Sequence, residues 1–93
     1  MPEEKAEIGA LAGQVVVVDT ATPFVYIGTL KEWQEHFVVL SDVDVHDTSQ
    51  GHSGKDLYTL EARRAGVQRN RREVAVRKDM VVSVSRLEDI LNY

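Results

Sequence analysis

The chain has 93 residues, a formal net charge of −4 and no cysteine. This length fits one small domain over residues 1–93, and the absence of cysteine excludes disulfides and thiolate metal sites as sources of stability. No apolar run approaches the ~18 residues of a membrane span, and the acidic start differs from a signal peptide. We therefore expect no membrane partner, and a cytoplasmic location is the default expectation.

Charge is distributed unevenly along the chain. Residues 1–62 carry eleven acidic and three basic side chains, whereas residues 63–78 carry seven basic side chains and only Glu73 as an acid. A basic segment in an acidic chain favours a polyanion site, an interface with an acidic surface, or simply a solvated face. In an oligomer, opposite charges could also meet across a subunit boundary.

The front half of the chain predicts one short helix followed by three strands. Early glutamates and helix-forming residues favour a helix over residues 3–12. Residues 15–18 are four consecutive valines, which predict a strand buried on both faces. A turn with a proline follows, and strand patterns then cover residues 24–33 and 37–45.

The back half predicts a helix and two further strands. Residues 46–54 form a polar loop, and residues 55–65 have the apolar spacing of a helix that ends at a glycine. Strand character resumes over residues 67–78 and returns over residues 81–85, after a tight charged turn. By itself, this order of elements is equally consistent with an OB-like or an SH3-like barrel.

Two segments carry more information than the others. Ile27-Gly28-Thr29-Leu30 is an apolar strand segment with an internal glycine, which predicts a sharp bend or a close backbone approach, and Trp33 and His36 follow it. Residues 74–84 form two alternating strands joined by the charged turn at Arg77 to Met80. These segments resemble the two sequence motifs of the Sm/Lsm family of ribonucleoproteins, of which the chain would be a divergent member.

The resemblance covers about residues 9–45 and 73–89 and implies a mainly β fold. The expected fold is a small five-stranded, strongly bent Sm-like (SH3-like) barrel with an N-terminal helix, in which residues 46–66 form a helical insertion between strands 3 and 4. In the family, the fourth strand of one subunit pairs with the fifth strand of the next. The resemblance thus implies a cyclic homo-oligomer of about six or seven copies. The expected interface residues are Val74, Val76, Val82 and Val84.

The family also implies a binding site for single-stranded RNA, formed by the loop after the second strand and the loop between the last two strands. There, an aromatic residue or His and an Arg sandwich a base, an Asn reads the base edge, and an Asp holds the Arg or the loop. His36 matches the stacking position, Arg77 matches the Arg, and Gln34 stands where the acid is expected. The Asn has no counterpart, because Val38 replaces it or the loop is one residue shorter.

The implied partner is therefore single-stranded RNA, bound with weak base selectivity. Stacking tolerates any base, whereas discrimination needs hydrogen bonds to base edges. Lys78 stands in place of the family's glycine in the last turn. The expected RNA-binding residues are His36, Arg77, Gln34, Lys78 and Phe37, with Arg69, Arg71 and Arg72 as auxiliary phosphate contacts.

Other interpretations of the same residues remain open at this point. Without the resemblance, His36 would be interpreted as a surface residue, and Arg77 as a side chain that is solvated or paired with an acid. Trp33 would be interpreted as a residue of the core or of a subunit interface. An alternative function is an oligomeric scaffold that binds a protein partner through the helix at residues 55–65, without RNA.

Catalytic and metal chemistry are disfavoured by the sequence. Asp42, Asp44, His46, Asp47 and His52 form a cluster rich in metal-ligand types, but counted from Asp42 it lacks the glycine and the final acid of a calcium loop. Residues 49–56 match a phosphate-binding loop only in part. We therefore expect no enzyme activity, no metal and no cofactor.

Overall fold

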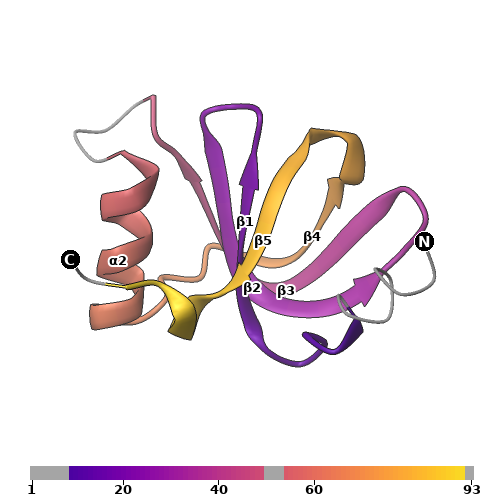
Figure 1. The fold of residues 1–93 in the computed structure, drawn as a ribbon, viewed down its shortest axis with the longest axis horizontal. Coiled ribbons are helices and arrows are strands. Elements are labelled where there is room, and N and C mark those ends of the chain that lie inside the picture. The colour runs from indigo at the N-terminus through magenta and orange to yellow at the C-terminus, as the bar shows by residue number, and fades with distance from the viewer. Residues whose placement is uncertain (1–8, 50–53, 92–93) are drawn as a thin grey trace.

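The computed structural model describes residues 9–49 and 54–91 and consists of one five-stranded antiparallel sheet with one α-helix beside it (Figure 1). The elements in chain order are β1 (Val15–Thr20), β2 (Phe24–Trp33), β3 (Phe37–Asp47), α2 (Lys55–Ala65), β4 (Arg71–Arg77), the 3-10 turn η1 (Lys78–Met80), β5 (Val81–Arg86) and the 3-10 turn η2 (Leu87–Asp89). None of the described helices is long and apolar enough to cross a membrane.

The strand order is β4-β3-β2-β1-β5, with every pairing antiparallel. The mainly β prediction is confirmed, and α2 lies between β3 and β4 over the expected residues. The sheet is not closed into a complete barrel, because β4 and β5 are its two edges. An exposed edge leaves unpaired backbone groups that another strand can use.

Two boundaries differ from the sequence prediction. Residues 67–70 are not a strand, and β4 starts only at Arg71, because the chain must first return from the end of α2 to the edge of β3. The predicted helix over 3–12 falls largely on residues 1–8, which lie outside the described part. Residues 10–13 form a turn. The turn ends at Gly13, whose φ is 84°.

The bend that Gly28 predicts is present in the middle of the sheet. A Cβ at this position would lie 3.1 Å from the Ser41 carbonyl oxygen and 3.2 Å from Val43 Cα. Opposite Gly28, the register between β2 and β3 slips, and Asp42 takes a positive φ of 52°. This is a β-bulge, in which β3 has an extra residue and the sheet curves more strongly.

The curved sheet separates two groups of buried side chains. One group lies within the curve and includes Val16, Val18, Leu30, Leu40 and Val76. The other lies on the opposite face of β1 and β2, where Val17, Val25 and Ile27 pack with Ala62 of α2. Strand β1 contributes to both groups, which confirms the prediction that the valine run is buried on both faces.

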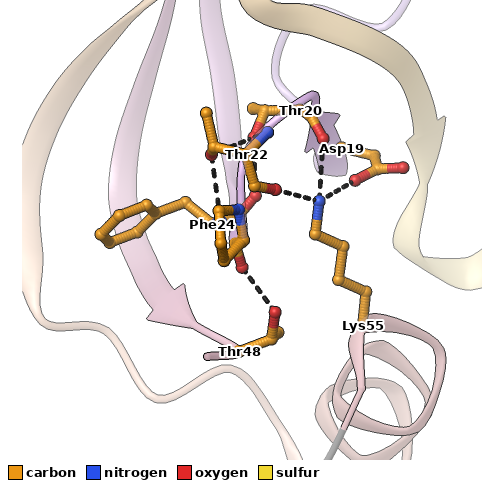
Figure 2. Close-up of polar contacts among 7 residues, drawn as sticks. Asp19, Thr20, Thr22, Phe24, Thr48 and Lys55 are labelled. Atoms are coloured by element: carbon orange, nitrogen blue, oxygen red, sulfur yellow. Dashed lines mark hydrogen bonds and ion pairs between the residues drawn. The ribbon is translucent and has the colours of Figure 1, made fainter. Parts of the chain in front are cut away.

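Polar contacts fix the start of α2 against the turn between β1 and β2 (Figure 2). The Lys55 ammonium donates to Asp19 Oδ1 at 2.6 Å and to the carbonyl oxygens of Thr20 and Thr22 at 2.8 and 2.6 Å. On the other side of the same turn, the Thr48 hydroxyl donates to the Pro23 carbonyl at 2.7 Å. Three donors on one ammonium satisfy three oxygens that the turn leaves free.

Candidate nucleic-acid interface

The turn between β2 and β3 and the turn between β4 and β5 lie side by side at one end of the sheet. Their neighbourhood follows from the strand register, in which Phe37 pairs with Arg77. Past this pair, the Lys78 amide donates to the His36 carbonyl at 2.9 Å. Within the first turn, the Gln34 amide donates to the Phe37 carbonyl at 2.9 Å. The backbone thus brings His36 and Arg77 together although 40 positions separate them in the sequence.

The two turns border an open hollow of about 720 Å³. Its lining comprises Glu35, His36, Phe37, Arg77, Lys78 and Asp79. The His36 side chain is 79% exposed, and Phe37 is 39% exposed, so both rings are accessible from solvent. Four of the five expected RNA-binding residues therefore gather at one place.

The fifth expected residue, Gln34, does not line this hollow. Its side-chain amide donates instead to Glu32 Oε2 at 3.2 Å. The acid that holds Arg77 is Asp79, whose Oδ2 accepts from the guanidinium at 2.6 Å. This pair matches the interpretation of Arg77 as an acid-paired side chain, and the spacing of Arg77 and Asp79 around one turn residue is the signal for it.

Lys78, at the position where the resemblance leads one to expect a glycine, lies in the turn without a positive φ. Positive φ values in the described residues occur at Gly13, Asp42 and Gly66 only, and Lys78 begins the 3-10 turn η1. Its ammonium lies 4.7 Å from the centroid of the Trp33 ring, within cation–π range. Trp33 packs against the inner core, so the Lys78 ammonium rests on a ring that the core holds in place.

The three auxiliary arginines lie away from the hollow. Arg71 pairs in register with Val43, at the opposite end of β4 from Arg77. Six residue steps along an extended strand correspond to roughly 20 Å. Arg69, Arg71 and Arg72 therefore do not reach a nucleotide that is held between His36 and Arg77.

The four expected interface valines differ in exposure. The side chain of Val76 is only 5% exposed and belongs to the inner core, and its place at an interface between copies stays a prediction. Val74 and Val84 are half-buried against the same core, and Val82 is 65% exposed. Alternation along β4 turns Val76 inward, so only its backbone is available at the sheet edge.

A second polar cluster, between β3 and α2, was not recognised as a unit in the sequence. The buried carboxylate of Asp44 accepts hydrogen bonds from the Tyr58 hydroxyl and, at 3.4 Å, from the Asn70 amide. The rings of His46 and Tyr58 stack with centroids 3.6 Å apart. Burial, and next the Asp44 carboxylate, raise the pKa of Tyr58 well above its ordinary value.

Two residues of the aspartate- and histidine-rich segment, Asp44 and His46, have structural roles in this cluster. Asp44 is committed to Tyr58 and Asn70, and His46 to its stack with Tyr58. In the ranges 9–49 and 54–91, no three His, Cys, Asp or Glu side chains gather as a metal site. His52 lies outside the described residues.

The chain is similar to known proteins in structure, but the sequence comparisons found no match. No protein-family model matches the chain, and no curated protein matches it significantly. The structure of the Sm protein of Pyrococcus abyssii in complex with a uridine heptamer is similar, with a TM-score of 0.60 and 20% identity over 87% of this chain and 93% of that one. An Sm-like protein of Archaeoglobus fulgidus matches with a TM-score of 0.60 and 12% identity over 92% of this chain and 93% of that one.

Proposed function

From the Sm-like fold of this chain, we propose that it is a divergent Sm-like protein that forms a ring and binds single-stranded RNA with weak base selectivity. The observation that carries the proposal is the hollow in which the exposed His36 and Arg77 meet, held together by the Lys78–His36 backbone hydrogen bond. The uridine heptamer bound by the Pyrococcus abyssii protein, which has a similar fold, supports RNA as the ligand.

The chemistry of the hollow suits stacking better than base reading. Imidazole and guanidinium groups offer flat faces to a base, and stacking one base contributes about 1–3 kcal/mol whatever its identity. No Asn or Gln side chain is among the lining residues, so the amide that would read a base edge is missing. Two acids and two permanent bases line the hollow, which limits its attraction for phosphates.

Ring assembly rests on the two sheet edges. Strands β4 and β5 end the sheet on opposite sides and do not pair with each other in the described residues. Neither strand contains a proline that would interrupt a ladder. Pairing of β4 from one copy with β5 from the next would satisfy both edges and, with a fixed rotation, would close a ring.

The RNA proposal is tested by fluorescence-anisotropy titration of a uridine heptamer and a mixed-sequence heptamer at physiological salt. We expect similar affinities for the two, and a loss of about tenfold or more in Arg77→Ala and in His36→Ala because each removes one stacking face. Arg86→Ala is the control, because Arg86 is an arginine paired with Glu88 and Asp89 outside the hollow. Nanomolar binding with strong preference for uridine would contradict weak selectivity.

Ring formation is tested with Val82→Pro. The register between β1 and β5 passes from Ser83 to Val81 and skips Val82, so proline there removes no assigned pair within the chain. At the outer edge, proline lacks the donor that a neighbouring strand would use. We expect a lower mass by light scattering for Val82→Pro and an unchanged mass for Val82→Thr. An unchanged mass in Val82→Pro would contradict this geometry.

A protein-binding scaffold is the second candidate, and the exposed Leu57 of α2 favours it. Ala62 of the helix is buried against the sheet, whereas Leu57 is 48% exposed. The RNA titration and the mass measurement described above also distinguish the protein scaffold from the RNA-binding ring. An intact oligomer that binds neither heptamer would favour the scaffold over the RNA ring.

A further inference from the structure

We propose that Arg69, Arg71 and Arg72, here called the arginine ridge, form a second RNA contact that binds backbone phosphates separately from the hollow. The inference rests on the proposed function, because it assigns the same class of ligand to another surface. The ridge lies at the start of β4, roughly 20 Å from Arg77 along the strand. It would therefore engage a different part of a longer RNA.

All three ridge side chains are exposed to solvent. Within residues 9–49 and 54–91, no ion pair within 4.0 Å involves any of them. The nearest acid in the strand is Glu73, and its carboxylate is paired with the Lys31 ammonium at 2.6 Å. The ridge thus keeps its positive charge available, in contrast to Arg77 and Arg86, which are paired within the chain.

Asn70 holds the backbone on which the ridge is built. Its amide N–H donates to the Val43 carbonyl at 2.9 Å, and its side chain exchanges two hydrogen bonds of 3.0 Å with the Val45 backbone. The Arg71 guanidinium in turn donates to the Asn70 carbonyl at 2.9 Å. An anchored backbone between Arg69 and Arg71 lowers the entropy that ordering these side chains on a ligand would cost.

The chemistry of the ridge favours phosphates over an acidic protein surface. All three residues are arginines, whose planar guanidinium groups bind phosphate oxygens in a bidentate way. Arg71 and Arg72 are consecutive residues of the edge strand β4, so their side chains leave opposite faces of the sheet and place positive charge on both sides of its edge, where a linear polyanion can pass. The surrounding chain is acidic, with a net charge of −4, so the ridge is also the place where a polyanion meets the least repulsion.

The test compares two variants that remove the same charge. Arg71→Gln/Arg72→Gln removes two unpaired arginines of the ridge, and Arg63→Gln/Arg86→Gln removes two arginines on the side of α2 and η2. Binding of a uridine heptamer and of an RNA of about 20 nucleotides, long enough to reach both surfaces, is measured across salt concentrations. Circular dichroism confirms that both variants are folded.

We expect the ridge variant to bind the long RNA about tenfold or more weakly, with a salt slope reduced by about 1.4, while its affinity for the heptamer stays the same. The control variant should bind both RNAs nearly as the wild type does. Equal losses in the two variants would overturn the proposal in favour of net charge alone. Unchanged long-RNA binding, or a change of oligomeric mass in the ridge variant only, would overturn it in favour of a solvated face or a contact between copies.

The same experiment separates this inference from the function of the hollow. If Arg77→Ala leaves heptamer binding unchanged but the ridge variant loses the long RNA, the hollow proposal fails and the ridge stands. If Arg77→Ala loses the heptamer and the ridge variant retains the long RNA, the ridge fails and the hollow stands.

Discussion

The two ends of the curved sheet are built in opposite ways. At one end, α2 covers β1 and β2, and Asp44, Tyr58, His46 and Asn70 form a tightly connected polar cluster. At the other end, the turns around His36 and Arg77 are exposed and border an open hollow. Figure 1 shows α2 on one side of the molecule and these turns on the other. The polar side chains at the helix end are thus engaged with one another, whereas those around the hollow are exposed to solvent.

Gly28 lies at the boundary between the two ends, and replacing it should have the largest effect on stability. Ile27 before it belongs to the helix-side core, and Leu30 after it belongs to the inner core. In Gly28→Val, the new side chain would collide with the backbone at Ser41 and Val43, which cannot move aside cheaply. We expect a loss of about 3 kcal/mol or more in the free energy of unfolding by urea titration. Wild-type stability would show that the close approach is not needed.

Tyr58→Phe tests the helix end. The change keeps the ring on His46 but removes the hydroxyl that donates to the buried Asp44. We expect a loss of about 1–3 kcal/mol at neutral pH, because the carboxylate loses its main partner. RNA binding at the hollow should not change, so anisotropy with the heptamer is the matched readout.

The raised pKa of Tyr58 gives the same variant a pH signature. The folded state favours the neutral phenol of Tyr58, because its pKa is raised there. The stability that Tyr58 contributes is therefore complete below the ordinary tyrosine pKa of about 10, and it is lost as the pH rises above that value. Wild type should therefore lose stability above about pH 10 more steeply than Tyr58→Phe does. Parallel alkaline profiles, measured by urea titration at each pH, would contradict a Tyr58 phenol that the fold keeps neutral.

Asp79→Asn tests the open end and should have the smallest effect on stability. Its ion pair with Arg77 is more than half exposed on both sides, and such pairs contribute about 0–1 kcal/mol. Release of the guanidinium should instead strengthen heptamer binding by about two- to fivefold. Asp89→Asn, which removes an acid paired with Arg86, is the control. Weaker binding in Asp79→Asn would mean that Asp79 orients Arg77 for the ligand.

The sequence predicted most of the fold because its strongest signals are local. The valine run, the glycine of β2 and the helix after the polar loop each have a clear physical cause, and all three are present. The start of β4 was predicted too early, since Val67 and its neighbours resemble a strand but only the hydrogen bonds of Asn70 decide where pairing begins. Where β4 begins therefore depends on hydrogen bonds to β3, a strand that is distant in the sequence.

The candidate site was predicted in part for the same reason. The resemblance placed His36 and Arg77 together, and the register of β3 and β4 brings them to one hollow. The resemblance placed Gln34 at the position of the acid, whereas Arg77 pairs with Asp79, because the sequence does not reveal which nearby polar side chain an arginine reaches. The sequence also did not show that the Val76 side chain is buried, because an alternating pattern leaves open which face of a strand is covered.

The double anchorage of the β1–β2 turn has a practical consequence for engineering the chain. Thr48 and Lys55 stand at the two ends of the segment that connects β3 to α2, and both donate hydrogen bonds to the β1–β2 turn, as Figure 2 shows. The start of α2 is therefore positioned by these contacts and not by the length of the connecting segment. Doubling the length of such a segment costs only about 0.6 kcal/mol in closure entropy. A fluorophore, an affinity peptide or a small folded domain can accordingly be inserted there at little cost to either end of the sheet.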